Sequence, residues 1–420
     1  MASKLDNARA WEARLERASA YALYLHVPFC AQKCAYCDFA SWATHRGDPL
    51  MSAYADALAL QVRELEGLGV LKGLHTAYLG GGTPSLLGAP VLGRLMACAS
   101  ALGPEELSCE ANPDSLGNDV IEALLSNGAT RVSVGVQSLV DTELVELGRL
   151  HDSALAQERL RAAVGSGLDV SCDLMCATPG QTDASWQETL EAAIALGVSH
   201  MSVYPLMIEE GTAFDRRYSN DECAWNSDEL QARRMQKAQV ELERHGFNQY
   251  EVASYAKADK ACKHNIAYWT AQPYFGLGTK ASSMLTLNLY LKLCDACRSL
   301  PAPPSEASRA RLTVKNSRSE IARDPQLASL RFDIEFLTEA QAAAEDLMLG
   351  ARMRVGLDPG LVAHARRLLP SLDECLDGLV TDGYLTARAG RLAPTERGWL
   401  LGNELYERLW DLAPGDVLEL

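Results

Sequence analysis

The chain has 420 residues, of which 48% are hydrophobic and 22% are charged, and its formal net charge is −16. This acidic balance argues against nucleic-acid binding, which normally needs a basic face. The sequence has no apolar run of about 18 residues that could span a membrane. Its 12 irregularly spaced cysteines are too sparse for a disulfide scaffold. We therefore expect a cytoplasmic protein.

Strand-like and helix-like segments alternate between residues 21 and 245. The strand candidates are 21–27, His75–Gly80, Leu107–Ala111, Thr130–Val136, Asp169–Cys176 and His200–Leu206. The helical patterns are Met51–Leu68, Pro90–Ala101, Asp119–Ser126, Ser153–Gly165, Ala184–Leu196 and Asp228–His245. This order predicts an α/β domain of parallel strands with right-handed crossovers, either an open doubly wound sheet or a barrel.

Polar motifs favour the barrel. They stand at the C-terminal ends of the predicted strands, which form the rim where a barrel builds its active site. These motifs are the first three cysteines, Gly80–Thr83, Glu110, Gln137 and Asp173. We therefore predict a partial (β/α)6 TIM-like barrel over residues 21–245.

The rest of the chain predicts three further units. Residues 1–20 contain a short amphipathic helix at 5–15, and residues 246–335 form an extension. Within the extension, a stretch rich in Pro, Ser and Arg at 298–319 is interpreted as a linker or surface excursion. Residues 336–420 have the order of a small winged helix, with helices, a short hairpin and a last helix. Acidic residues outnumber basic ones there, so we expect a packing or interaction domain.

Three cysteines, Cys30, Cys34 and Cys37, follow the first predicted strand with spacings of three and then two intervening residues. Three thiolates can hold three irons of a cubic iron–sulfur cluster and leave the fourth iron open to a small ligand. A zinc site is the alternative, but zinc sites usually pair a C-x-x-C with a second pair. The spacing therefore favours the cluster.

The polar residues on the other strand ends suggest a pocket. The turn Gly80-Gly-Gly-Thr-Pro84 can bring backbone N–H groups close to a ligand as a small anion nest. The carboxylate of Glu110 needs a partner, which is either a cationic ligand or a salt bridge to Arg131 or Arg149. Asp173 is placed to accept hydrogen bonds from ribose hydroxyls, and Gln137 offers an amide. Together they indicate a pocket for a nucleoside linked to an amino acid.

These motifs carry a resemblance to a known family. Tyr24-Leu-His-Val-Pro-Phe-Cys30, the cysteine loop, Gly-Gly-Gly-Thr-Pro-Ser, Glu-Ala-Asn-Pro and Ser-Val-Gly-Val-Gln-Ser resemble the radical S-adenosylmethionine superfamily, as does Pro179-Gly-Gln-Thr182. Within it, the chain is similar to the branch of oxygen-independent coproporphyrinogen III dehydrogenases and HemW-type heme chaperones. One departure is Cys176-Ala-Thr-Pro179, where the family commonly has Tyr-Gly-Leu-Pro.

The resemblance implies a 4Fe–4S cluster on Cys30, Cys34 and Cys37, with S-adenosylmethionine chelated at the unique iron. It implies that an electron passed into the sulfonium yields methionine and a 5′-deoxyadenosyl radical. It also implies an electron donor such as flavodoxin or ferredoxin. The pocket positions that it transfers to this sequence are Tyr24, Tyr36, Gly81, Gly82, Thr83, Glu110, Gln137, Arg149, Asp173 and Met207.

Two features favour the chaperone branch over the dehydrogenase branch. The dehydrogenase type has a further cysteine two residues past the third ligand, but here Cys37 is followed by Asp38 and Phe39. In addition, the segment from His264 to Trp269 matches the H-N-x-x-Y-W motif that is associated with heme binding in the chaperones. His264 offers an axial ligand for heme iron. The resemblance thus implies heme as cargo and apoproteins as partners, with a coproporphyrinogen III dehydrogenase or a heme-degrading methyltransferase as alternatives.

Overall fold

The computed structural model describes residues 19–218, 224–297, 299–413, 415 and 418–419. The helix expected at 5–15 lies outside these residues. No helix in the described part of the chain is long and apolar enough to cross a membrane.

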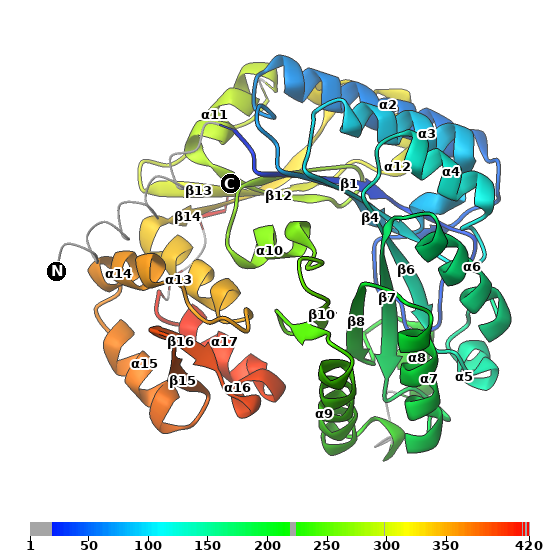
Figure 1. Cartoon of the computed structure of the whole chain (residues 1–420). Coiled ribbons are helices and arrows are strands. Elements are labelled where there is room, and N and C mark those ends of the chain that lie inside the picture. The colour runs from blue at the N-terminus through cyan, green and yellow to red at the C-terminus, as the bar shows by residue number, and fades with distance from the viewer. Residues whose placement is uncertain (1–18, 219–223, 298, 414, 416–417, 420) are drawn as a thin grey trace.

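Six parallel strands form the centre of the molecule, in the spatial order β1-β4-β5-β6-β7-β8. They are β1 (Ala22–Val27), β4 (Thr76–Gly81), β5 (Glu106–Ala111), β6 (Arg131–Gln137), β7 (Asp169–Cys176) and β8 (His200–Pro205). All six strands predicted from the sequence are therefore confirmed. The sheet curves without closing, and helices cover its outer side (Figure 1), which is the arrangement expected of a partial barrel.

The predicted helices are also present and cover the outer face of the sheet. They are α2 (Pro49–Gly67), α3 (Gly88–Ser100), α4 (Asn118–Ser126), α6 (Ser153–Gly165), α7 (Asp183–Ala195) and α9 (Asp228–Arg244). Shorter helices α5 (Asp141–Glu146), α8 (Ala213–Tyr218) and η1 (Pro84–Leu87) lie between them in the chain. Local signals explain where they start: Asp48 caps α2 ahead of Pro49, and Thr182 forms a capping box on α7.

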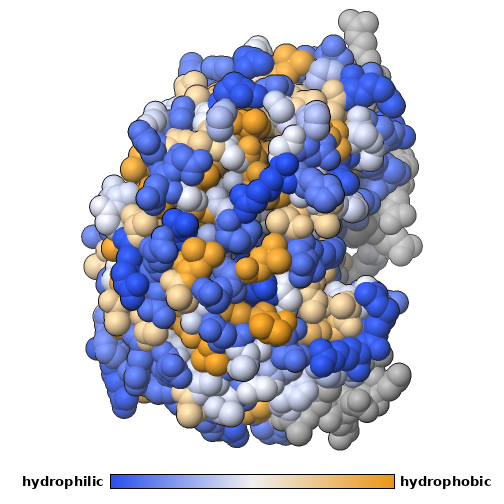
Figure 2. All heavy atoms as spheres, turned by 90° about the vertical axis from the view of Figure 1, so that its right-hand side faces the viewer, coloured by the Kyte–Doolittle hydropathy of each residue, from blue (hydrophilic) through white to orange (hydrophobic). Residues whose placement is uncertain are grey.

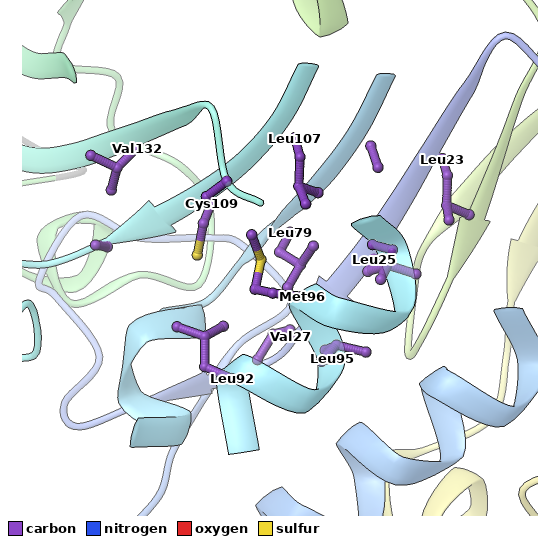
Figure 3. Packing of buried hydrophobic residues seen from close by; sticks show 14 of the residues in the cluster. Leu23, Leu25, Val27, Leu79, Leu92, Leu95, Met96, Leu107, Cys109 and Val132 are labelled. Carbon is purple, nitrogen blue, oxygen red and sulfur yellow. The ribbon is translucent and has the colours of Figure 1, made fainter. Parts of the chain in front are cut away.

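Side-chain alternation separates the core from the concave side of the sheet. On β1, Leu23 and Leu25 are fully buried against the helices, and so are Leu107 and Cys109 on β5. Figure 3 shows these strand residues facing Leu92, Leu95 and Met96 of α3, labelled together with Val27, Leu79 and Val132. Because a strand has a period of two, the intervening residues point to the concave side. That side carries polar groups.

The sheet continues beyond the barrel on both sides. Next to β1 the order runs β11, β12, β13, β14 and β17, and next to β8 it runs β10 and β9, so that 13 strands form one sheet. Their bounds are β9 (Asn248–Gln249), β10 (Ser254–Ala256), β11 (Tyr274–Leu277), β12 (Ser282–Thr286), β13 (Ala307–Val314), β14 (Phe332–Thr338) and β17 (Leu418–Glu419). Only β11 among these pairs in parallel, with β1; the other added strands pair antiparallel.

The linker predicted at 298–319 is wrong over its second half. Strand β13 lies there, between β12 and β14. Its polar composition misled the prediction because a charged residue, Arg309, is buried and pairs with Asp346 and Glu345. The short helices α11 (Leu287–Ala296), α12 (Arg318–Arg323) and η3 (Leu327–Ser329) complete this part of the chain. Another short helix, η2 (Ala224–Asn226), comes just before α9.

The C-terminal part is mainly helical and packs around its own apolar cluster. It contains α13 (Glu339–Gly350), α14 (Pro359–Leu368), α15 (Leu372–Thr381), the hairpin β15 (Leu385–Arg388) and β16 (Arg391–Pro394), α16 (Glu396–Leu400) and α17 (Gly402–Trp410). A hairpin between helices was expected, but two helices, α16 and α17, follow it instead of the single last helix. Between this part and the barrel lies a short helix, α10 (Lys263–Trp269), on the concave side of the sheet (Figure 1).

One outer face of the molecule carries many hydrophilic residues with small groups of apolar side chains among them (Figure 2). This face is on the side of the barrel helices. The polar groups that concern function are instead on the concave side and at the C-terminal ends of the strands.

Candidate functional site

The cysteine loop connects β1 to α2 and includes the short strands β2 (Phe29–Cys30) and β3 (Trp42–Ala43). Cys30, Cys34 and Cys37 are free and half-buried. The loop is tied to its surroundings by backbone hydrogen bonds, from Thr44 N–H to the Cys30 carbonyl (2.8 Å) and from Ala35 N–H to the Leu147 carbonyl (3.1 Å). In the described part of the chain, no group of three His, Cys, Asp or Glu side chains is arranged to hold a single metal ion.

Arg149 connects the cysteine loop to the strand ends. Its guanidinium donates to the Cys34 sulfur (3.2 Å), to the Asn112 side-chain oxygen (2.7 Å) and to the Gly135 carbonyl (2.5 Å). Burial raises the pKa of the Cys30 thiol, while hydrogen bonds and the charge of Arg149 act in the opposite direction. Metal ligation needs thiolates, so this cation favours the ligating form. Hydrogen bonds to cluster sulfurs also tune a cluster's potential.

The glycine turn packs directly against the cysteine loop. A Cβ at Gly81 would lie 2.3 Å from the His26 ring, and one at Gly82 would lie 2.8 Å from the backbone of Phe29. Thr83 donates its hydroxyl to the Cys30 sulfur at 3.6 Å. Glycine is therefore needed here because the two loops touch, and Gly81 also has φ of 107°.

The anion nest expected at this turn is not formed. The N–H of Gly81 donates to Glu110 (2.9 Å), that of Gly82 to the Val27 carbonyl (2.9 Å) and that of Thr83 to the Phe29 carbonyl (2.8 Å). All three donors are thus used inside the protein. The turn offers a ligand close access to its backbone, but it does not offer these N–H groups.

Glu110 finds neither of the salt-bridge partners considered for it. Its carboxylate accepts hydrogen bonds from the Tyr78 hydroxyl (2.9 Å) and from Gly81 N–H, whereas Arg131 pairs with Glu106. Burial raises the pKa of Glu110 to about 7, although these two hydrogen bonds lower it. A carboxylate held without a cation is suited to a positively charged ligand.

Asp173 lies among serines. It accepts hydrogen bonds from the hydroxyls of Ser133 (2.8 Å) and Ser171 (3.3 Å). Burial raises its pKa, and hydrogen bonds from these serines and from Ser202 oppose the shift. The sequence did not single out the serines. They could have been found from the strand period, because Ser171 and Asp173 lie two residues apart and therefore share a face.

The remaining residues expected in the pocket lie in different surroundings. Gln137 ends β6 at a register shift with φ of 71°, an unusual conformation for a residue other than glycine. Tyr24 is on the concave side of β1 and bonds to His26 (3.0 Å). Tyr36 packs against a small apolar cluster beside the cysteine loop, and Met207 is 56% exposed just after β8.

His264 is almost fully buried, with 1% of its surface exposed. Its Nδ1 is hydrogen-bonded with the Thr76 hydroxyl (2.9 Å) and its Nε2 with the Tyr268 hydroxyl (3.0 Å). The ring also stacks on Tyr78 at a centroid distance of 5.0 Å. Burial lowers the pKa of His264 to about 3, so the ring is neutral, as an iron ligand must be. Both ring nitrogens, however, are already engaged in hydrogen bonds.

One cavity of about 320 Å³ brings together four of the expected site residues, Tyr24, Glu110, Asp173 and His264. Its walls come from the concave faces of β1 and β4–β8 and from α10, and they include Tyr24, Tyr78, Glu110, Arg131, Asp173, His200, Tyr204, His264 and Tyr268. A second cavity of about 480 Å³ lies on the other side of α10, against β12–β14. Tyr268 lines both cavities. The other expected residues do not line the first cavity: Cys30, Cys34, Cys37, Tyr36, Gly81, Gly82, Thr83, Gln137, Arg149 and Met207.

Comparisons with known proteins agree with this arrangement. Residues 24–193 match the family model described as the Radical SAM superfamily. The chain is 31% identical over 399 residues to the heme chaperone HemW of Mycobacterium tuberculosis, covering 93% of this chain and 94% of that protein. It is 30% identical over 395 residues to HemW of Lactococcus lactis, covering 92% and 96%.

The chain belongs to the HemW family of the radical S-adenosylmethionine superfamily. Its fold is also that of a solved structure, the coproporphyrinogen III oxidase HemN of Escherichia coli, with a TM-score of 0.72, 19% identity and coverage of 95% of this chain and 92% of that one. Membership implies a 4Fe–4S cluster and S-adenosylmethionine as cofactors. Three free thiols on one loop, with Arg149 donating to the Cys34 sulfur, fit the cluster, and the carboxylate of Glu110, which has no cationic partner, fits a cationic ligand.

Proposed function

We propose that this chain is a heme chaperone of the radical S-adenosylmethionine type, which binds heme and transfers it to apoproteins. The observation that carries the proposal is its similarity, over more than nine-tenths of its length, to proteins named heme chaperones. The cysteine loop supports it, since Cys37 is followed by Asp38 and Phe39 and the next cysteine is Cys98. We place this activity in the cytoplasm, where reduced thiols persist.

Each cofactor has its own residues in the proposal. Cys30, Cys34 and Cys37 hold the cluster, and Arg149 orients the Cys34 sulfur. A bound cluster supplies a low-potential site for an electron from a donor such as flavodoxin or ferredoxin. S-adenosylmethionine lies along the strand ends, held by Tyr24, Tyr36, Gly81, Gly82, Thr83, Glu110, Gln137, Arg149, Asp173 and Met207. His264 ligates heme iron, and Trp269 offers it an apolar surface.

Heme titration tests the chaperone function, and the chain offers a matched control. His200, like His264, is buried, is hydrogen-bonded through both ring nitrogens and lines the 320 Å³ cavity. We expect His264→Ala to lose the histidine-ligated absorption spectrum and the transfer of heme to an apoprotein. His200→Ala should keep both. Equal behaviour of the two variants would reject His264 as the ligand.

Cluster content and turnover complete the test. After anaerobic reconstitution, serine variants of Cys30, Cys34 or Cys37 should lose iron and labile sulfide, whereas Cys98→Ser should keep them because Cys98 lies on α3, away from the loop. The reconstituted protein should not convert coproporphyrinogen III. Many turnovers to protoporphyrinogen would overturn the chaperone function in favour of the dehydrogenase, and open-ring tetrapyrrole products would favour a heme-degrading enzyme.

A further inference from the structure

The surroundings of His264 raise a question about how this residue reaches iron. An iron ligand needs a neutral imidazole with a free lone pair. Here one ring nitrogen faces Thr76 and the other faces Tyr268, and the ring is 1% exposed. Heme therefore has no access to His264 unless one of these hydrogen bonds is broken.

The two partners of the ring differ in how firmly they are held. Thr76 is fully buried in β4, which pairs with β1 on one side and β5 on the other. Tyr268 is on the short helix α10 and lines both cavities. A movement of Tyr268 needs no change in the sheet, whereas a movement of Thr76 would disturb its central strands.

The backbone of α10 is anchored separately from the Tyr268 side chain. Glu106 accepts hydrogen bonds from the backbone N–H groups of Lys263 and His264, at 3.0 Å each. Glu106 is itself buried and paired with Arg131 at 3.3 Å. This anchor fixes the start of the helix, so His264 can keep its place while Tyr268, one turn later, turns away.

We propose that Tyr268 is a gate and Thr76 a positioning residue for heme ligation by His264. The inference rests on the proposed function. The Nδ1–H of His264 donates to the Thr76 hydroxyl, and this bond orients the ring. The Tyr268 hydroxyl donates to Nε2 and occupies the lone pair that iron needs. When Tyr268 leaves, Nε2 becomes free and the 320 Å³ and 480 Å³ cavities become connected at that point.

Metal-bound histidines in proteins are usually oriented in the same way as His264 is here. Such a histidine generally donates its second ring N–H to a neighbouring oxygen, which fixes the tautomer and the ring orientation. Thr76 supplies that oxygen here. For a ligand that binds only the open state, the apparent affinity is the intrinsic affinity multiplied by the fraction of protein that is open. Removal of the gate's hydrogen bond increases this fraction and therefore tightens binding.

Heme titration of four variants tests the gate and the positioning residue. Tyr268→Phe keeps the aromatic wall and removes the hydroxyl, so we expect hemin to bind about tenfold tighter with an unchanged histidine-ligated spectrum. Tyr274→Phe is the matched control, because Tyr274 packs its ring edge-on against that of Tyr268, with centroids 4.6 Å apart, and lines the larger cavity. Thr76→Val should bind more weakly with an altered spectrum, while Thr76→Ser keeps the wild-type values.

The outcomes of these titrations distinguish failure of the gate, of the positioning role and of the ligand assignment. If Tyr268→Phe binds hemin no tighter than Tyr274→Phe while His264→Ala still loses the spectrum, the gate is rejected and the heme function stands. If Thr76→Val matches Thr76→Ser in affinity and spectrum, the positioning role is rejected. If His264→Ala binds hemin like the wild type, the ligand assignment fails, and the gate fails with it. Thermal melting of each variant shows that the fold is kept.

Discussion

Replacement of Glu110 by glutamine should make the protein more stable at high pH. Burial raises the pKa of Glu110 from its ordinary 4.5 to about 7 in the folded state. Between these two values the folded state keeps a proton that the unfolded state loses, so stability falls as pH rises. The difference between the two pKa values corresponds to a loss of at most roughly 3 kcal/mol in the free energy of unfolding, since the side chain keeps some exposure to its cavity. Glutamine does not ionise and therefore avoids this loss.

Urea unfolding of the ligand-free protein between about pH 5 and about pH 8 measures the effect. The free energy of unfolding of Glu110→Gln, relative to the wild type, should increase across this interval and level off above pH 7. Glu105→Gln is the control: this exposed carboxylate bonds to Lys263, and its pKa is lowered rather than raised. A Glu110→Gln difference that stays constant with pH would refute the reasoning.

Three other variants test local features by urea unfolding. Ala177→Gly should stabilise the fold by about 1 kcal/mol because Ala177 has φ of 56°, and unchanged stability would contradict strain there. Gly81→Ala should disrupt the turn, since its Cβ would meet the His26 ring at 2.3 Å, and iron binding after reconstitution should fall with it. Arg309→Met should destabilise by about 3–5 kcal/mol because the buried carboxylate of Asp346 loses its cation while Glu345 keeps only Arg311, and a loss under about 1 kcal/mol would argue that Asp346 becomes protonated.

The barrel and the cysteine loop could be predicted because their signals are local. Each strand is a short apolar run followed by a polar motif, and the period of a strand assigns the two faces. The linker prediction failed at Arg309 for the opposite reason. A buried arginine is satisfied only by residues that are distant in sequence, Glu345 and Asp346, and no local pattern shows them.

The environment of His264 could not be predicted for a similar reason. Its motif singled it out, but Thr76, which is hydrogen-bonded with its ring, is 188 positions away in the chain. Likewise, the sequence left either a cationic ligand or a salt bridge to Arg131 or Arg149 open as the partner of Glu110, and only the fold shows that both guanidinium groups are engaged elsewhere. Sequence patterns identified the polar residues, whereas their partners depend on strand order.

The continuity of the sheet has a consequence for dividing this protein into pieces. Strand β11 borders β1, strand β10 borders β8, and β14 runs through the expected boundary at 335–336. A fragment that stops at residue 245 would strip both flanks of the six-stranded core and leave unpaired backbone along each. Exposed edge strands of this kind form backbone hydrogen bonds with other chains. The isolated barrel should therefore precipitate or self-associate, and cofactor loading has to be studied on the entire polypeptide.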